Sequence, residues 1–454
     1  MGFVKKHFYF NKQFLMSVLL IALPVALQNV ISFGVNMMDS VMLGQLGSVA
    51  ISAANFGGKP FFLLLIIGFG LASGGSVLIA QYWGKGDIDK IRRFIALSLQ
   101  VCMLTSVIFT VASIAFPKQL VGLFTKEAAV IEQGAAYLGT LAFSYVFYSF
   151  SNCYMMCLRA VEKVKVSTVV YGISFFINVI FNYLFIFGKF GFPCLGVRGA
   201  AIGTIMARVS EFLMVIWYMY FREKTVGFKI KDLFCFYKEL VGDYIKYSLP
   251  VVGNELFWGL GSVVLSVIIG HISTAFAAVN SIADVINQLT SVAAFGIANA
   301  AAVLTGKTIG IGKKKTAQKM ANTLILLAFG VGIIGCAAIL LLRTPILSIY
   351  KLTEYERQMT WDVLTVLALL QLVLSVDLTI IVGVLRGGGD TKTALAIDCG
   401  CQWVIAVPLG AVAGLVFGLP AGITYFIMRS DTVLKTVVGI IRVAGGKWIM
   451  NITK

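Results

Sequence analysis

Long apolar stretches separated by short polar segments run along almost the whole of this chain. A helix needs about 20 mostly apolar residues to span a bilayer, and each of these stretches is at least that long. Because their apolar residues are continuous rather than alternating, the stretches favour helices over the strands of a membrane barrel. We predict twelve transmembrane helices, over residues 14–44, 49–82, 94–116, 130–156, 166–188, 199–221, 247–270, 275–306, 320–342, 360–384, 393–416 and 419–441.

The same pattern of small and apolar residues occurs twice. Pro24 in ALPVALQN matches Pro250 in SLPVVGNE, in the second half of the chain. The other matches are Gly44 with Gly270, 68–86 with 294–312 and, after one inserted residue, 157–165 with 384–392. Each copy contains six predicted helices, an even number, so both copies enter and leave the membrane on the same face. This is the parallel repeat of several transporter folds, which hold substrate between their halves near the middle of the membrane.

The repeat predicts an all-α integral membrane protein of two six-helix lobes. We assign residues 1–221 to the N-lobe, 222–246 to a cytoplasmic linker and 247–454 to the C-lobe. Pro24 and Pro250 fall inside the first helix of each lobe, where proline removes a backbone hydrogen bond and bends the helix. Both prolines are therefore predicted hinges.

The net charge of +17 raises the question of an acidic partner, and the distribution of the basic residues answers it. With both termini in the cytoplasm, 26 of the 37 Lys and Arg fall on the cytoplasmic side and eight on the opposite side. That excess is the positive-inside bias of membrane proteins, so the charge indicates orientation and argues against nucleic acid as a partner. We expect a multi-pass protein of the cell (inner or plasma) membrane, in contact with lipid and acting as a monomer.

Few residues are suited to metal, redox or nucleotide chemistry. The chain has eight cysteines without a CxxC pair, most of them inside predicted helices, and only two histidines, His7 and His271. It lacks the GxxxxGK[ST] loop that cradles phosphates. We therefore expect no cofactor, no metal centre beyond a bound Na⁺, and no ATP-driven transport.

Seven carboxylates lie within predicted helices, where ionisable groups are costly and tend to mark function. Glu211 follows Arg208 by three residues and Asp431 precedes Lys435 by four, spacings that predict structural ion pairs on one helix face. The remaining acids, which have no such neighbour in the sequence, are Asp39, Glu255, Asp284, Asp377 and Asp398.

Asp39 is the strongest candidate for a functional acid. It follows Pro24 by fifteen residues and has no nearby Lys or Arg in the sequence. Asn178 and Asn182 are four residues apart and so share one face of the fifth predicted helix. Amides in a hydrocarbon span need hydrogen-bond partners. Together with Asp39 they predict an oxygen-rich pocket for a proton or Na⁺, although bonds to neighbouring helices alone would also account for the two amides.

These features together resemble the multidrug and toxic compound extrusion (MATE) family over essentially the whole chain. The residues that carry the resemblance are Asp39 with Gly44, the paired segments GLASGGSVLIAQYWGKG and GIANAAAVLTGKTIGIG, VLRGGGDTK, and GVRGAAIGT at 196–204. The resemblance implies two lobes in a V and antiport of organic cations or amphipathic drugs against H⁺ or Na⁺. It also implies an N-lobe cation site of Asp39, Asn178, Asn182 and Thr204.

Two departures from the family pattern bear on coupling. Position 182 is Asn where some members carry a second Asp, so this chain offers one carboxylate, which favours H⁺ over Na⁺. Some members also couple through C-lobe carboxylates, and Glu255 and Asp377 lie on the corresponding helices, Asp377 two positions away from the pattern. We treat these two residues as a possible second site.

Two other functions stay open. A lipid-linked saccharide flippase of the same superfamily would share the fold, but usually has extra helices and an arginine-rich cavity. An intramembrane enzyme would need a metal set or catalytic dyad, for which two histidines outside HExxH give little support. The sequence favours an efflux transporter of small drugs or toxic metabolites that works by alternating access.

Overall fold

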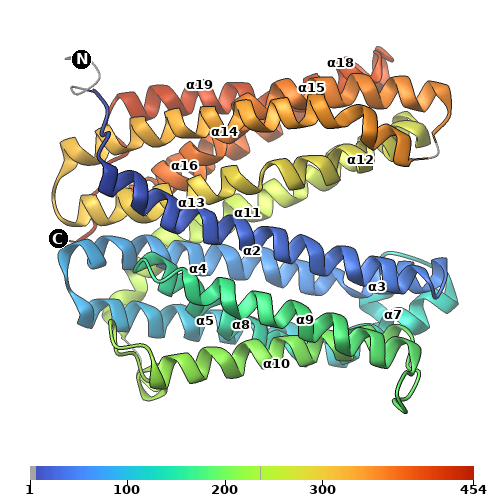
Figure 1. Ribbon diagram of the computed structural model, residues 1–454, viewed down its shortest axis with the longest axis horizontal. Coiled ribbons are helices and arrows are strands. Elements are labelled where there is room, and N and C mark those ends of the chain that lie inside the picture. The colour runs from blue at the N-terminus through green and yellow to red at the C-terminus, as the bar shows by residue number, and fades with distance from the viewer. Residues whose placement is uncertain (1–6, 236, 351, 454) are drawn as a thin grey trace. The chain divides into compact units, whose positions relative to one another are not determined.

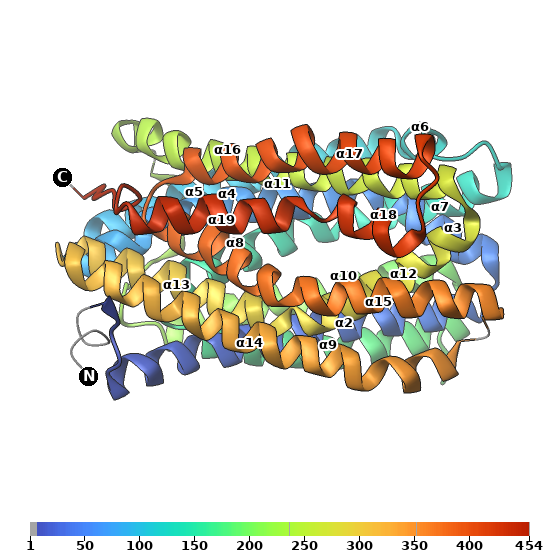
Figure 2. The ribbon, with the colours of Figure 1, turned by 90° about the horizontal axis from the view of Figure 1, so that it is seen from above.

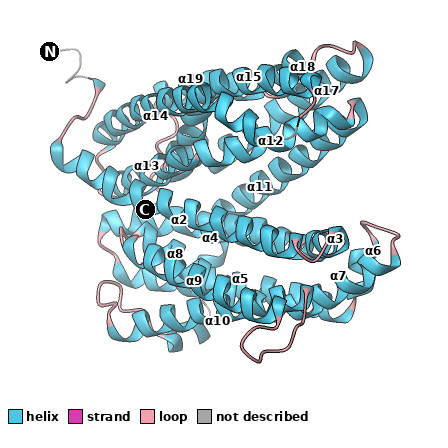
Figure 3. Ribbon diagram, turned by 45° about the vertical axis from the view of Figure 1, so that its right-hand side comes forward, coloured by secondary structure: helices cyan, strands magenta, loops and turns pink. Residues whose placement is uncertain are grey.

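The computed structural model describes residues 7–235, 237–350 and 352–453, and Figure 3 shows that these residues form helices joined by short loops, without strands. Its α-helices are α2 (Lys12–Gly44), α3 (Ser48–Gly57), α4 (Lys59–Lys85), α5 (Ile88–Ala115), α6 (Pro117–Gly122), α7 (Ala128–Leu141), α8 (Ser144–Ala160), α9 (Lys165–Phe187), α10 (Val197–Phe221), α11 (Lys238–Ile272), α12 (Thr274–Thr290), α13 (Val292–Gly310), α14 (Lys314–Ile349), α15 (Glu354–Leu378), α16 (Thr391–Cys401), α17 (Val407–Ala411), α18 (Ala421–Met428) and α19 (Asp431–Ala444). Shorter elements are the 3₁₀ helix η1 (Ile230–Phe234) and the π-helical turns η2 (Thr379–Leu385), η3 (Gln402–Ala406) and η4 (Val412–Val416).

Helices occupy all twelve predicted segments in the described part of the chain. Ten segments contain a helix that is long and apolar enough to cross a membrane. The other two, 130–156 and 419–441, are each divided into two shorter helices, α7 with α8 and α18 with α19. The prediction of an all-α integral membrane protein with twelve membrane-crossing segments is confirmed.

The internal repeat is visible in the hydrogen bonds of two turns. After α8, the amide of Lys163 donates to the Leu158 carbonyl and that of Glu162 to the Arg159 carbonyl. After η2, in the matching segment of the second copy, the amides of Asp390 and Gly389 make the same two bonds to Leu385 and Arg386. Glu162 and Gly389 both adopt a left-handed conformation, with φ of 64° and 85°. Both turns are therefore Schellman caps, in which a left-handed residue ends the helix.

The chain falls into two compact units, and two long helices belong to both. The first unit comprises Met1–Ala26, Ala80–Gly86 and Gly253–Lys454, and the second Leu27–Ile79 and Asp87–Val252. Both α2 and α11 therefore begin in one unit and continue in the other. The assignment of 1–221 and 247–454 to two lobes stays a prediction.

In the second unit, α9 and α10 run side by side, as Figure 1 shows, and α8 packs against both α5 and α10. Apolar side chains of α2, α3, α9 and α10 form one buried cluster around Ala53 and Ile186. The polar amides of α9 lie next to this cluster, because Asn178, Asn182 and Ile186 follow one another at helical spacing along the buried face. The same face thus contributes both packing and polar contacts.

In the first unit, α14 and α15 run side by side, which Figure 2 shows from above. The ends of α4 and α13 approach so closely that a Cβ at Gly84 would overlap the Lys307 carbonyl, and one at Gly310 would overlap that of Gln81. These two contacts are related by the repeat, since Gly84 matches Gly310 and Gln81 matches Lys307. Small residues allow such backbone contact between membrane helices.

The C-terminal segment that follows α19 covers this end of the first unit. Trp448 is fully buried, and its indole nitrogen donates to Gln318 at 2.9 Å. Its ring and carbonyl lie where a side chain on Gly388 would be. The side-chain amide of Gln81 donates to the Met450 carbonyl at 3.0 Å and accepts from the Ile452 amide at 2.9 Å.

Candidate functional site

Asp39 meets the two asparagines that the sequence associated with it. The amide nitrogen of Asn182 donates to an Asp39 carboxylate oxygen at 2.5 Å and to the Asn178 side-chain oxygen at 3.2 Å. Asn178 and Asn182 are fully buried, whereas Asp39 is half-buried. No ion pair of Asp39 is found within the described ranges, so an amide rather than a cation holds this carboxylate.

Both asparagines keep a polar atom without a partner in the described part of the chain. These atoms are the side-chain oxygen of Asn182 and the side-chain nitrogen of Asn178. The Asn182 oxygen faces α10 at Gly203, where a Cβ would overlap it. Buried polar atoms are normally hydrogen-bonded, and exceptions tend to mark a binding or switching role. Asp39, Asn178 and Asn182 can therefore still accept one hydrogen bond, at the Asn182 oxygen, and donate one, from the Asn178 nitrogen.

Thr204 follows Gly203 on α10 but makes a different contact. Its hydroxyl donates to the Ala200 carbonyl of its own helix at 3.1 Å. One turn further along, Arg208 pairs with buried Glu211 at 2.8 Å, the ion pair expected from their spacing. Arg208 is also close enough to Asp39 to interact with it electrostatically. The structure thus brings Asp39, Asn178 and Asn182 together, and leaves Thr204 on the neighbouring helix with its hydroxyl bonded to its own backbone.

A second polar network lies within the first unit and contains Glu255. Its carboxylate pairs with the Arg386 guanidinium at 2.7 Å. Arg386 is buried and also donates to the side-chain oxygen of Asn254 at 3.0 Å. The nitrogen of the same amide donates to Asp398 at 2.5 Å. Asn254 thus joins the Glu255–Arg386 pair to a second carboxylate on α16.

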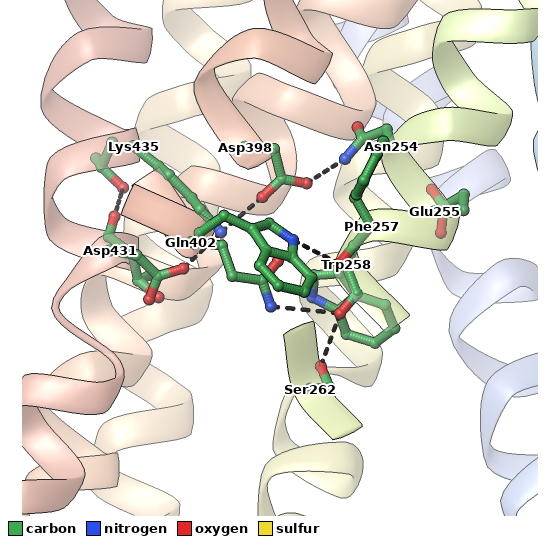
Figure 4. Close-up of polar contacts among 12 residues, drawn as sticks. Asn254, Glu255, Phe257, Trp258, Ser262, Asp398, Gln402, Asp431 and Lys435 are labelled. Carbon is green, nitrogen blue, oxygen red and sulfur yellow. Dashed lines mark hydrogen bonds and ion pairs between the residues drawn. The ribbon is translucent and has the colours of Figure 1, made fainter. Parts of the chain in front are cut away.

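Lys435 links one further carboxylate, that of Asp431, to this network through Asp398, as Figure 4 shows. Its ammonium lies 2.6 Å from Asp398 and 2.6 Å from Asp431, the second being the pair predicted from the sequence. Asp377 is buried nearby, interacts electrostatically with Lys435, and has one oxygen without a partner among the described residues. Counting Glu255 and Arg386, four carboxyl groups face two cationic groups in this network.

The two polar sites do not occupy equivalent places in the two copies. In the register of the repeat that aligns Pro24 with Pro250, Asp39 corresponds to Leu265, and Glu255 to Asn29. Each copy therefore has an acidic side chain where the other has a neutral one. The copies do share one polar contact, between an arginine that follows the fourth helix of the copy and a side-chain amide on the first helix of the same copy. In the first copy Arg159 binds Gln28, and in the second Arg386 binds Asn254.

Sequence reasoning missed these arginines and the long-range partners of several acids. Arg386 is far from Glu255 in the chain, and so is Lys435 from Asp398. Asp284 likewise meets Arg429, at 3.4 Å. The repeat did contain a signal, because both arginines lie in the matched segments 157–165 and 384–392.

Pro24 and Pro250, the two predicted hinges, lie inside α2 and α11, which continue as helices through them.

The described residues contain no group of three or more His, Cys, Asp or Glu placed to hold a metal ion. The Asp39 trio offers one carboxylate and two amide oxygens.

Known proteins resemble the chain over nearly its full length. The family model MatE matches residues 24–184 and 250–412. The probable multidrug resistance protein NorM of Thermotoga maritima is 25% identical over 435 residues, which cover 94% of this chain and 92% of that protein. The probable multidrug resistance protein YoeA of Bacillus subtilis is 23% identical, covering 87% and 86%.

Solved structures share the fold. The outward-facing structure of a multidrug resistance MATE family transporter of the MOP superfamily aligns with a TM-score of 0.86 at 18% identity, over 95% of this chain and 96% of that one. A MATE structure in the bent conformation aligns with a TM-score of 0.83 at 19% identity, with the same coverage.

Proposed function

Because this chain belongs to the MatE family of transporters, we propose that it is a multidrug efflux transporter that exchanges organic cations or amphipathic drugs for H⁺. It is a multi-pass membrane protein. The relatives named as multidrug resistance proteins support drugs and toxic metabolites as cargo. The observation that carries the coupling is the carboxylate of Asp39, held by the Asn182 amide within a membrane-spanning helix.

Protonation of Asp39 changes what this contact can be. An ionised carboxylate only accepts hydrogen bonds, whereas a protonated one also donates. A protonated Asp39 can therefore donate its hydrogen to an acceptor, and the side-chain oxygen of Asn182, which has no partner among the described residues, is one that it can use. The amide of Asn182 has to rotate for that bond to form. We infer that this rotation couples the protonation of Asp39 on α2 to a change in the packing of α9 and α10.

Transport then follows an alternating-access cycle. A proton from outside neutralises Asp39, α2 repacks around Pro24, and drug leaves to the outside. The emptied protein opens inward, the proton leaves to the cytoplasm, and another drug molecule enters. Glu255 and Asp377 form a possible second site of the same kind, since Asp377 keeps an unpartnered carboxylate oxygen within the described residues.

The ratio of acidic to basic groups in the polar network of the first unit argues against a flippase of lipid-linked saccharides. Such a cargo carries phosphate groups and is best met by an excess of cations. The network around Lys435 and Arg386 instead has more carboxylates than cations. We therefore favour neutral or cationic cargo.

Proteoliposomes with one imposed gradient at a time test the proposal. An inward pH gradient in sodium-free buffer should drive fluorescent-drug efflux, and a Na⁺ gradient alone should not. Asp39→Asn should abolish gradient-driven efflux while leaving yield and drug binding in detergent near wild type, because the substitution removes a costly charge from a membrane-spanning helix and keeps an oxygen that can accept from the Asn182 amide. Asn178→Ala and Thr204→Ala should have milder effects.

Three results would contradict parts of this proposal. Drug movement without any gradient would show that the protein does not couple cargo to an ion. Efflux driven by Na⁺ alone would overturn the proton assignment. A wild-type rate for Asp39→Asn would move the coupling site away from α2, and Glu255→Gln would then decide whether it lies in the second network.

A further inference from the structure

The helices α2 and α11 pass from one compact unit to the other at matching positions. The change falls between Ala26 and Leu27 in α2, and between Val252 and Gly253 in α11. In both helices it comes two residues after the internal proline. Proline leaves a carbonyl one turn back without its helical hydrogen bond, which makes that turn the softest point of the helix.

Each helix is fixed just before its proline by a glycine of its own unit. A Cβ at Gly296 on α13 would lie 2.6 Å from the carbonyl oxygen of Ala22, two residues before Pro24. In the second unit, a Cβ at Gly74 on α4 would overlap Ser248, two residues before Pro250. Backbones in such contact cannot slide or separate without breaking the packing.

Each helix is fixed again four residues after its proline, this time by an arginine. Arg159 donates to the Gln28 side-chain oxygen at 2.9 Å, and the Gln28 nitrogen donates to Thr168 at 2.9 Å. In α11, Arg386 donates to Asn254 while Asn254 donates to Asp398. Both ends of each amide are therefore bound. Hydrogen bonds to a charged donor are about twice as strong as neutral ones.

The arginines themselves are held in equivalent positions. Arg159 and Arg386 each supply the carbonyl that accepts from the left-handed residue of the Schellman caps described above. The caps fix the backbone from which both guanidinium groups extend. The arrangement occurs twice in one chain, although the surrounding polar residues differ.

We propose that Arg159 and Arg386 are positioning residues that bind the downstream halves of α2 and α11 to their own units, so that bending is confined to the turn around each proline. The proposal rests on the alternating-access cycle, which requires these helices to bend. In α2 the confined bend transmits to Asp39, eleven residues beyond Gln28. In α11 the bound segment includes Glu255, the next residue after Asn254.

Distances between spin labels on the full-length protein test this directly. Genetically encoded nitroxide residues replace exposed Met16 and Met37 in α2, or exposed Ile245 and Val267 in α11, so each pair brackets one proline. The purified protein in nanodiscs is measured by pulsed electron paramagnetic resonance, without drug. Losing a hydrogen bond to a charged group shifts a conformational equilibrium by roughly tenfold or more. Arg159→Met should therefore broaden the α2 distance distribution.

The two helices serve as controls for one another. Arg159→Met should broaden only the α2 pair, and Arg386→Met only the α11 pair. Broadening of both pairs by either substitution would mean general loosening and would overturn the proposal, as would no change in the matched pair. Arg159→Lys, which keeps the charge and one donor, should restore a narrower α2 distribution. If Arg159→Met gives no folded protein, Gln28→Met removes the same bond from the other partner and should broaden the same pair.

Substitution of the proline tests whether Arg159 acts by confining the bend of α2. In a Pro24→Ala background the α2 helix regains its backbone hydrogen bond, so Arg159→Met should leave the α2 distribution narrow. An equal broadening in both backgrounds would show that the arginine acts on packing alone. These measurements need no transport. Failure of wild-type efflux in proteoliposomes would therefore count against the proposed function and not against the positioning role of Arg159 and Arg386.

Discussion

The contact between Asp39 and Asn182 depends on the absence of one methyl group on α10. A Cβ at Gly203 would overlap the Asn182 side-chain oxygen, while Asn182 is fully buried and has little room to move. Gly203→Ala should therefore displace the amide from Asp39 and reduce proton-driven efflux strongly. Gly172→Ala on α9 is the matched control, because its Cβ would meet only Ile31, at 4.0 Å.

The control should be as stable as wild type or more so, since Ala is favoured over Gly within a helix by about 1 kcal/mol. Efflux rates in proteoliposomes and thermal unfolding of the purified variants provide the two readouts. Normal efflux by Gly203→Ala would show that the position of the Asn182 amide does not matter for transport.

Adding a second carboxylate beside Asp39 should change the ion preference. In Asn182→Asp two negative charges lie at hydrogen-bonding distance, and their attraction for a cation at that range grows with each charge. We expect efflux that depends on external Na⁺, where the wild type runs in sodium-free buffer. Efflux measured against Na⁺ concentration at constant pH checks this, and a variant that stays indifferent to Na⁺ would remove position 182 from the coupling site.

At this scale the sequence predicted side chains that lie on one helix face, and it predicted little across helices. Asn178 and Asn182 could be paired from their spacing, and Asp39 was the partner suggested because it has no Lys or Arg near it in the sequence. Glu255 looked isolated because Arg386 is distant in the chain, although it lies 2.7 Å away in space. Helical periodicity relates neighbours three and four residues apart and contains no information about which helices pack together.

At the scale of elements, the C-terminal segment after α19 provides the clearest stability prediction. Trp448 is fully buried and contacts the backbone at Gly388, so Trp448→Ala leaves a large cavity under the turn that follows η2. Replacing a buried aromatic side chain by Ala costs about 3–5 kcal/mol. The thermal midpoint of the purified protein should fall clearly. Trp217→Ala, at a position that is 53% exposed, should leave it nearly unchanged.

Equal midpoints for these two tryptophan variants would mean that the C-terminal segment contributes nothing to the stability of the first unit. Nothing in the amino-acid pattern indicated the role of this segment, because a short mixture of polar and apolar residues after a helix looks like any tail. The pattern also did not reveal the breaks between α7 and α8 and between α18 and α19. Neither Gly nor Pro marks the first break, at Ala142 and Phe143, so tertiary packing rather than local propensity determines it.

At the scale of the molecule, hydropathy predicted the number of membrane segments and the repeat predicted their pairing. Neither could reveal that α2 and α11 are each shared by two compact units. A helix that changes unit at a proline has the same apolar length as one that stays within a unit. The passage of each helix from one unit to the other is shown by the matching contacts before and after Pro24 and Pro250. Those contacts involve residues that are distant in the chain.

The orientation of the whole molecule in the membrane can be predicted from charge and from contacts within the first unit. The N-terminal backbone at Tyr9 donates to Thr323 near the start of α14, and the C-terminal Thr453 carbonyl accepts from Lys85 at the end of α4. Tyr9 and Thr453 therefore lie toward the ends of helices whose loops are rich in Lys and Arg. From the positive-inside bias we predict that both termini, together with the 222–246 linker, face the cytoplasm.

Single-cysteine labelling in intact cells tests this orientation. Lys229 in the linker and Lys126 before α7 are both exposed, so each accepts a membrane-impermeant maleimide if it faces the medium. The eight native cysteines are replaced first. Lys126→Cys should react in intact cells, and Lys229→Cys should react only after the membrane is opened. The reverse pattern would invert the topology. It would also invert the transport cycle, because the proton that reaches Asp39 from outside would then enter from the cytoplasm.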